Sequence, residues 1–576
     1  MSTSHSTDSD RTLQLTASPN PAFVDQPIHL LLTGALPSER VRLTAWLIDD
    51  AGRRWESRAE FTADATGTVD PTRDAPLQSA SPYRALDPMG LFWSMQLNPD
   101  DAGAHDQYLK RELTPTEITI EASAPSLRHI ARLRIERHHV PPSATIRAVD
   151  GDHQGKTLAG LLFIPAPEAP DPCDDNALSP DAASAPRPRP RNYKRPAIIT
   201  LGGSGGGLDW ETAAALCAHG YAALALPYFG FDPLPSSLNS IPLEYFERAI
   251  AWLCRQPEID PGRLAIHGIS RGGELALLLA TRIPLIRAVV GVVPGNVIWQ
   301  ATGTPPPETA ADLIFNFNSA NAANAVPLAP ADLPGSTDQP INTNATGVPP
   351  AASPATTTLT PNQLDPAAQT ATDSSAAASS AAASLTQPDS SNPPAHQKSR
   401  TKPSVPIKRT PGNTERSSWT YQGSHLPFVP YAMARFRILT AIGVISFRRP
   451  VRFINLHRDS LRQKDAALAA EIPVENAAAA ILLISAEDDQ VWPSENMSDA
   501  IVRRLTDHHY PHEFTHLKNP GAGHLLRLPH TPATTASSKL PNFGLRVAFG
   551  GNPADTAAAR LRAWLATLSF LSRNLT

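Results

Sequence analysis

The stretch LAIHGISRGGELALLLA, residues 264–280, decides the fold of this chain. It begins with a short apolar run, continues through the pattern G-x-S-x-G at 268–272, and ends in a segment rich in Leu and Ala. This order predicts a strand, a sharp turn at Ser270 and a helix, which is the arrangement of a nucleophile elbow. The serine hydroxyl would then stand at the carboxyl end of a sheet and at a helix N-terminus. A plain glycine turn is the alternative interpretation.

The surrounding sequence repeats this alternation of strand and helix. From about residue 141, apolar strands alternate with helical stretches, and this alternation is typical of a mostly parallel sheet flanked by helices. We therefore predict an α/β hydrolase fold in two parts, 141–300 and 426–576. The expected strands are 197–201, 221–226, 264–269, 288–293 and 481–484, and the expected helices are 213–217, 243–253, 273–280 and 494–506.

A different periodicity occupies residues 11–140. Apolar residues there alternate at period two in short runs separated by turn-rich segments, as in Val41, Leu43, Ala45 and Leu47. Such a pattern predicts an all-β sandwich. The region offers no cluster of His, Cys or paired carboxylates, so we expect its role to be structural.

Three segments have the composition of disordered chain. The N-terminus 1–10 is polar, 166–195 is rich in Pro and Arg, and 301–425 is dominated by Ala, Ser, Thr, Pro and Asn. Segments with so few aromatic residues cannot bury enough apolar area to offset chain entropy. We predict that 301–425 loops out of the hydrolase domain, which is tolerable if its ends emerge close together.

The composition indicates which classes of partner and which cellular compartment to expect. The chain has 576 residues with 50 Lys and Arg against 54 Asp and Glu, a net charge of −4, which argues against a broad nucleic-acid-binding face. Three cysteines suggest a reducing compartment, and we find neither a secretory signal nor an apolar run long enough to span a bilayer. The expectation is a cytoplasmic protein that binds no nucleic acid and does not insert stably into membranes.

A serine nucleophile needs a base and an orienting acid, in the chain order Ser, acid, His for this fold. Acidic residues follow the expected strand 481–484, and we choose Asp488, with Asp489 second. A glycine-rich loop then presents His524 as the base. Other histidines compete for that role and are better read as surface or strand residues: His508, His509, His512, His516 and His530.

The oxyanion hole should combine two sources of backbone amides. One is the residue after the nucleophile, Arg271. The other is the glycine-rich loop 201–207, from which we choose Ser204 and Gly205. A phosphate-binding reading of that loop is weaker, because it lacks the Lys-Ser/Thr of a P-loop. No His, Cys or carboxylate spacing matches a zinc or calcium site, and we expect neither a metal nor a cofactor.

Several motifs together make the chain resemble a known family. The hydrolase part carries PAIITLGGSGGGL (196–208), LEYFE (243–247), GISRGGEL (268–275) and EDDQVW (487–492), and the N-terminal part carries WESRA (55–59) and LDPMGLFWSM (86–95). These resemble the acyl-CoA thioesterases and bile acid-CoA:amino acid N-acyltransferases. The resemblance implies an immunoglobulin-like N-terminal domain, a triad of Ser270, Asp488 and His524, and an acyl-CoA substrate.

Departures from the family pattern refine this expectation. The N-acyltransferase members use cysteine at the elbow, and Ser270 therefore favours water as the acyl acceptor. Lysine commonly follows the nucleophile in the family, whereas Arg271 stands here and could still meet a phosphate or a helix carboxylate. The C-terminal residues 573–576 are not a peroxisomal signal.

The favoured hypothesis is hydrolysis of an acyl-CoA thioester through an acyl-enzyme. Transfer of the acyl group to an amine, general carboxylesterase or peptidase activity, and a non-catalytic scaffold remain the alternatives. The sequence does not indicate the acyl-chain length or the oligomeric state.

Overall fold

The computed structural model describes residues 11–101, 106–149, 157–173, 193–302, 416–433, 449–539 and 546–576. The predicted disordered N-terminus 1–10 lies outside these ranges. So do 174–192 of the Pro-rich insert and 303–415 of the large insert. The prediction of disorder for these segments stays a prediction.

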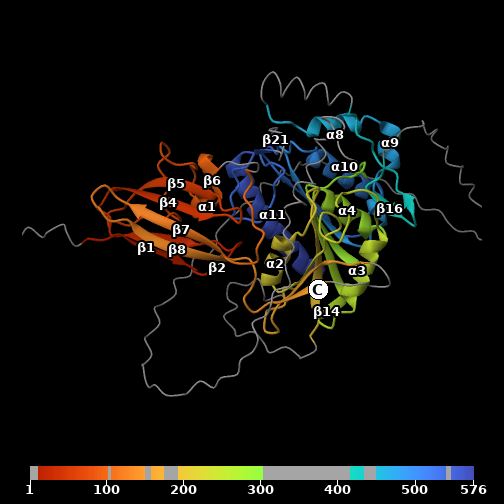
Figure 1. Ribbon diagram of the computed structural model, residues 1–576, viewed down its shortest axis with the longest axis horizontal. Helices are drawn as coiled ribbons and strands as arrows, with labels where there is room; N and C mark the ends of the chain where they lie inside the picture. The colour runs from red at the N-terminus through yellow and green to blue at the C-terminus, as the bar shows by residue number, and fades with distance from the viewer. Residues whose placement is uncertain are drawn as a thin grey trace, which may run out of the picture. The chain divides into compact units, whose positions relative to one another are not determined.

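The N-terminal part is built of β-strands, drawn in red to orange in Figure 1. A six-stranded sheet has the order β2-β8-β7-β4-β5-β6, and β1 pairs with β3 beside it. The strands are β1 (Gln14–Ser18), β2 (Ala22–Phe23), β3 (His29–Thr33), β4 (Arg40–Ile48), β5 (Arg54–Thr62), β6 (Gln96–Leu97), β7 (Thr116–Ser123) and β8 (Ala131–His138), with the short helices α1 (Gly90–Trp93) and η1 (Pro99–Asp101).

The alternation in the sequence explains this sheet. Val41, Leu43, Ala45 and Leu47 of β4 are all buried, and the residues between them point away from the core. Their burial follows from the strand geometry, in which successive side chains face opposite sides. These strands agree with the predicted all-β sandwich, and the sandwich and its immunoglobulin-like class stay predictions.

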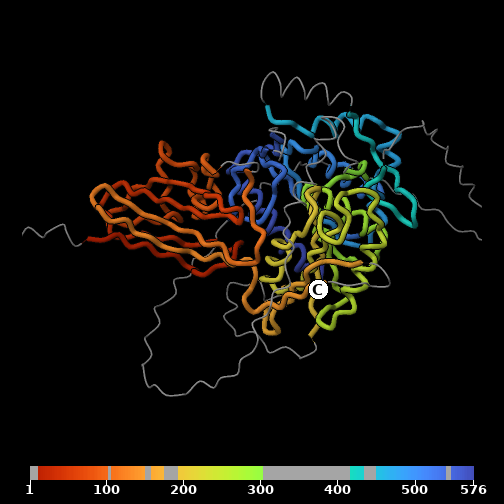
Figure 2. Tube along the Cα trace, viewed as in Figure 1, coloured from red at the N-terminus to blue at the C-terminus, as the bar shows by residue number. Residues whose placement is uncertain are grey.

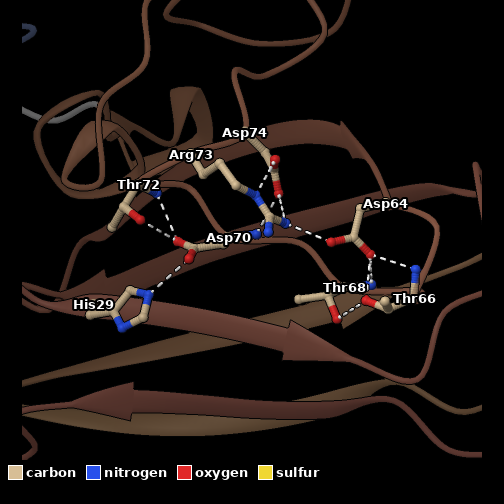
Figure 3. Close-up of polar contacts among 8 residues, drawn as sticks. All are labelled: His29, Asp64, Thr66, Thr68, Asp70, Thr72, Arg73 and Asp74. Carbon is tan, nitrogen blue, oxygen red and sulfur yellow. Dashed lines mark hydrogen bonds and ion pairs between the residues drawn. The ribbon is translucent and has the colours of Figure 1, made fainter. Parts of the chain in front are cut away.

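A polar network ties together the loops on this domain (Figure 3). Its members are His29, Asp64, Thr66, Thr68, Asp70, Thr72, Arg73 and Asp74. Asp70 accepts hydrogen bonds from the Thr72 amide (2.9 Å) and hydroxyl (2.6 Å), and lies 3.1 Å from His29 Nε2. Burial alone would raise the pKa of the Asp70 carboxyl, but these hydrogen bonds outweigh it and hold the pKa below its usual range.

The second part is an eight-stranded sheet of order β19-β18-β15-β14-β11-β12-β10-β9. Six neighbouring strands of this sheet are parallel to one another: β19, β18, β15, β14, β11 and β12. At the other edge, β10 pairs antiparallel with both β12 and β9. The predicted mostly parallel sheet is confirmed. The strands are β9 (Thr145–Val149), β10 (Gly160–Ile164), β11 (Arg195–Leu201), β12 (Ala222–Ala225), β14 (Ile259–Ile269), β15 (Ile286–Val292), β18 (Ala480–Ala486) and β19 (Phe514–Asn519).

Helices cover both faces of this sheet (Figure 1). One apolar core joins the sheet to α3, α4 and α10, and a second core joins the opposite face to α2 and α11. The helices are α2 (Trp210–Ala218), α3 (Glu244–Cys254), α4 (Arg271–Ala280), α8 (Ile454–Ser460), α9 (Lys464–Ala469), η2 (Val474–Asn476), α10 (Ser494–Asp507) and α11 (Pro553–Asn574). Over the described ranges, none of them is long and apolar enough to cross a membrane.

Two small sheets complete the part. One consists of β13 (Ile241–Pro242), β16 (Trp419–Tyr421) and β17 (Ser424–His425), and the other pairs β20 (Ser537–Lys539) with β21 (Arg546–Ala548). Figure 2 shows the green segment that ends at 302 and the blue segment that follows 449 within the same body of structure. The sheet is therefore assembled from chain on both sides of the large insert.

The predicted end of the large insert, at residue 425, is wrong. Residues 416–425 lie within the described range 416–433, and Trp419 of β16 is fully buried. The low-complexity composition masked this short segment, although a single tryptophan buries enough apolar area to anchor it.

The two ends of the insert lie side by side. The Ala301 amide donates to the Arg416 carbonyl (2.8 Å), and Gln300 pairs with Ser417 in an antiparallel bridge. Adjacent ends let a long loop close without distorting the fold. The condition for tolerating the insert, that its ends lie close together, is met at these residues.

Replacement of 303–415 by a flexible linker of about six residues should leave the fold intact. The ends are already paired, and loop-closure cost falls by about 0.6 kcal/mol for each halving of loop length. We expect an unchanged or slightly higher Tm in calorimetry. A deletion extended to Trp419 is the control and should lower Tm sharply. Loss of the cooperative transition in the shorter deletion would contradict the pairing.

Asp70→Asn should destabilise the N-terminal domain in a pH-dependent way. A carboxyl whose folded pKa is depressed adds stability above its unfolded pKa of about 3.8, and this stability is lost as pH falls through the folded pKa. At pH 7 we expect a loss of about 1 kcal/mol from unfolding curves. The difference from the unaltered chain should shrink below pH 4. The exposed Asp100→Asn serves as control, and an equal effect there would refute the role of the network.

Candidate active site

Ser270 stands on a strained turn between β14 and α4. Its backbone has φ 57° and ψ −116°, and non-glycine residues at positive φ cluster at functional sites. Glycine is required at both flanking positions, because neither has room for a side chain. A Cβ added at Gly272 would lie 2.2 Å from the Leu201 carbonyl oxygen, and one at Gly268 would lie 2.1 Å from the Gly272 oxygen. The predicted strand-turn-helix at this point is confirmed.

His524 reaches Ser270 from the loop after β19. Its Nε2 lies 3.1 Å from Ser270 Oγ, and its Nδ1 lies 2.8 Å from Asp489 Oδ2. A carboxylate only accepts hydrogen bonds, so Nδ1 carries the proton and Nε2 is left to accept from the serine hydroxyl. Residues 254 positions apart in the chain are thereby within proton-transfer distance.

The choice of Asp488 as the orienting acid is wrong, because Asp489 occupies that place. Asp489 is 1% exposed, and its second oxygen accepts from the amides of Val491 and Trp492. Asp488 is exposed and turns away, accepting from the Gly551 amide at 2.9 Å. In a tight turn, neighbouring side chains diverge. Only one of two adjacent acids can therefore face the imidazole.

The competing histidines lie elsewhere. His508, His509 and His512 are exposed at the end of α10 and beyond. His516, on β19, lies 2.7 Å from Ser485 Oγ and 3.1 Å from Asp499 Oδ1. Burial lowers the pKa of His530 to about 4. The selection of His524 over these residues agrees with its position beside Ser270.

The glycine-rich loop approaches the nucleophile at Gly203. A Cβ there would lie 3.2 Å from Ser270 Cβ, while one at Gly205 would meet nothing within 4 Å. The amides of Gly206 and Gly207 already donate within the loop region, to Gly203 and Phe229 oxygens. The loop thus lies beside Ser270 at Gly203, the residue before the predicted Ser204 and Gly205.

The Arg271 side chain turns inward, away from solvent. Its guanidinium pairs with Glu274 (2.6 Å) and donates to Ser418 Oγ. Trp419 Nε1 donates to the other oxygen of Glu274 at 2.9 Å. Of the two partners expected for Arg271, a phosphate or a helix carboxylate, this structure shows the carboxylate.

Burial governs the electrostatics of this pair. Removal from water raises the pKa of Glu274 to about 7, although Arg271 and Trp419 oppose the shift. Sequence reasoning missed Glu274, Ser418 and Trp419. The i, i+3 spacing of Arg271 and Glu274 was a signal for Glu274. Nothing in the local sequence pointed to Ser418 and Trp419, which lie beyond the insert.

An aromatic cluster lies behind the histidine. The Trp492 ring meets His524 edge-on with centroids 6.2 Å apart, and Trp299 stacks on Tyr431. His457 stands edge-on to Trp299 at 4.7 Å, and burial lowers its pKa to about 4, so it stays neutral near pH 7. The sequence analysis did not identify this cluster. It fills the space behind the acid loop with rigid rings.

Two family models match the chain. The acyl-CoA thioester hydrolase/BAAT N-terminal region matches residues 25–167, and the BAAT/acyl-CoA thioester hydrolase C-terminal model matches 241–325 and 410–576. The chain belongs to the acyl-CoA thioester hydrolase/BAAT family. The candidate site residues Ser270, Asp489 and His524 all fall within the C-terminal match.

Curated relatives of this family are similar over about half the chain. A bile acid-CoA:amino acid N-acyltransferase of Mus musculus is 32% identical over 298 residues, covering 50% of this chain and 63% of the relative. Acyl-coenzyme A thioesterase 1 of Homo sapiens is 31% identical over 278 residues, covering 47% of this chain and 58% of the relative. The matches thus cover less than two thirds of either relative.

Solved structures are more distant. A puromycin-hydrolysing peptidase of Mycobacterium tuberculosis shares 12% identity, covers 98% of this chain and 67% of its own length, and has a TM-score of 0.36. The α/β hydrolase description of this chain therefore rests on its sheet order and on the C-terminal family match.

Asp489→Asn should slow covalent labelling of Ser270 by a fluorophosphonate probe by up to the order of 10⁴-fold. The amide would favour the wrong imidazole tautomer while keeping the geometry. Asp488→Asn is the matched control, and it should label within about two-fold of the unaltered chain. If Asp488→Asn proved the slower of the two, Asp489 would not be the orienting acid.

Proposed function

We propose that the chain hydrolyses fatty acyl-CoA thioesters to free acid and CoA through Ser270, His524 and Asp489. The observation that carries this proposal is the unbroken hydrogen-bonded line from Ser270 Oγ through the imidazole to the buried carboxylate. Membership of a family whose models are named for acyl-CoA thioester hydrolases supports the substrate class.

The first half of the reaction forms an acyl-enzyme. His524 Nε2 takes the hydroxyl proton as Ser270 Oγ bonds to the thioester carbonyl carbon. The tetrahedral oxyanion collapses, the carbon–sulfur bond breaks, and the imidazolium returns its proton to the departing CoA thiolate. Asp489 holds Nδ1–H throughout and stabilises the transient imidazolium charge.

Backbone amides would stabilise the oxyanion. The amide of Arg271 is at the N-terminus of α4, where helix amides lack intrahelical acceptors. The loop amides of Ser204 and Gly205 are the proposed second source, supported by the contact of the neighbouring Gly203 with Ser270. The glycines allow the loop to approach without side-chain collisions.

The second half consumes water. His524 deprotonates a water molecule, which attacks the acyl carbon and releases the fatty acid from Ser270. An amine acceptor would use the same acyl-enzyme, and the similarity to a bile acid-CoA:amino acid N-acyltransferase makes this the second candidate function. Serine at the elbow, in place of the cysteine of the transferase members, favours water.

We place the reaction in the cytoplasm. Cys217 and Cys254 are free thiols, which supports a reducing compartment. Burial raises the pKa of Cys217 to about 12, so its thiolate is not available for chemistry.

Ser270→Ala should abolish acyl-CoA hydrolysis. Loss of the nucleophile in comparable triads lowers kcat on the order of 10⁶-fold. The measurement is release of free CoA thiol from acyl-CoAs of graded chain length, with circular dichroism as the folding control. Turnover within a few-fold of the unaltered chain would remove Ser270 from the mechanism.

The acceptor is tested in the same assay. Glycine or taurine is added, and products are separated by mass spectrometry. Free acid as the sole product supports the hydrolase, whereas a conjugate would establish the transferase. Faster turnover of oxygen esters than of thioesters would favour a general carboxylesterase, and an unlabelled Ser270 would favour a scaffold.

A further inference from the structure

The loops that carry the candidate acid and base share one backbone acceptor. The carbonyl oxygen of Phe549 accepts from the His524 amide (3.0 Å) and from the Gln490 amide (3.3 Å). Gln490 directly follows Asp489. The position of Phe549 therefore affects both ends of the Asp489–His524 hydrogen bond.

Phe549 is itself held by the β20–β21 hairpin. It follows β21 directly, and its amide donates to the Ala536 carbonyl at 2.8 Å. The hairpin pairs Ser537 with Ala548 and Lys539 with Arg546 in antiparallel register. Whatever fixes this hairpin also fixes the acceptor on which the two catalytic loops depend.

The N-terminal domain binds the segment that leads into this hairpin. The Ala533 amide donates to the Trp93 carbonyl (2.8 Å), and Thr534 Oγ1 donates to the Met95 carbonyl (2.6 Å). Ala533 is buried within the apolar core of the N-terminal domain itself. The N-terminal domain, for which we expected only a structural role, therefore binds the chain nine residues after His524.

One carboxylate of the N-terminal domain joins both strands of the hairpin. Asp106 Oδ1 accepts from the Lys539 amide at 2.9 Å, and its Oδ2 pairs with Arg546 at 2.7 Å. Its side chain is only 12% exposed, so solvent screens these contacts weakly. Lys539 ends β20 and Arg546 begins β21, so the carboxylate joins the two strands at the end of the hairpin from which the connecting residues 540–545 depart.

We infer that the N-terminal domain positions the catalytic dyad, with Asp106 as the positioning residue. The path runs from Asp106 through the hairpin to Phe549, and from its carbonyl to the backbone of His524 and of the residue after Asp489. Displacement of a catalytic group by about 1 Å costs on the order of 10²-fold in rate. The inference rests on the proposed triad, and it assigns the N-terminal domain a part in catalysis.

The test compares two contacts between the same domains. Asp106→Ala removes the hairpin contact. Asp25→Asn weakens a contact with no part in the path, where Asp25 accepts from Trp564 Nε1 (2.8 Å) and His219 Nε2. We expect Asp106→Ala to lower kcat about ten-fold or more with KM within two-fold, and to slow fluorophosphonate labelling of Ser270 equally. Asp25→Asn should lower Tm while leaving kcat unchanged.

Two milder variants guard against misfolding. Asp106→Asn keeps an oxygen for the Lys539 amide and should recover part of the loss. Thr534→Val removes one hydroxyl donor without changing side-chain volume, and it should lower kcat about three-fold through the same path. A folded Asp106→Ala with kcat and labelling within two-fold of the unaltered chain would overturn the inference, and so would equal losses in Asp25→Asn.

The labelling rate separates this inference from the proposed function. It reports the reactivity of Ser270 whatever the natural substrate. If the unaltered chain is labelled but leaves acyl-CoA intact, the thioesterase proposal fails while the ratio between Asp106→Ala and Asp25→Asn still decides the role of Asp106.

Discussion

The turn at Ser270 is the constraint on which the site depends. A positive φ at a non-glycine residue is unfavourable, and it persists only because β14, α4 and the Leu201 end of β11 are packed around it. Glycines at 268 and 272 allow that packing, since any side chain would collide with backbone. The same packing directs the hydroxyl of the buried Ser270 toward His524, beside the glycine loop.

Buried polar contacts also hold the helix α4, which follows this turn. Arg271 and Glu274 lie on the first turn of the nucleophile helix, out of water, and an unpaired charge there would cost several kcal/mol. Ser418 accepts a further hydrogen bond from Arg271, and Trp419 donates one to Glu274. The chain on the far side of a long insertion is therefore needed to satisfy the helix that follows the nucleophile.

Much of the fold was predictable from residue patterns. Period-two alternation in β4 and the apolar runs of β11, β14, β15 and β18 located strands because each is stabilised by burial of its own side chains. Ser270 and His524 were found by their glycine contexts. The acid was misassigned by one position, because Asp488 and Asp489 have the same local surroundings in sequence and differ only in the direction that the turn gives them.

By itself the sequence determined the elbow at 264–280, the order of strands and helices along the chain, and the candidate nucleophile and base, because these depend on interactions between near neighbours. Only the tertiary structure decided that Asp489 faces the imidazole and that Arg271 pairs with the buried Glu274. It also decided that Asp106 of the N-terminal domain contacts the β20–β21 hairpin beside the site. Such contacts join residues tens to hundreds of positions apart. Their partners are selected by packing and by the need to pair buried polar groups.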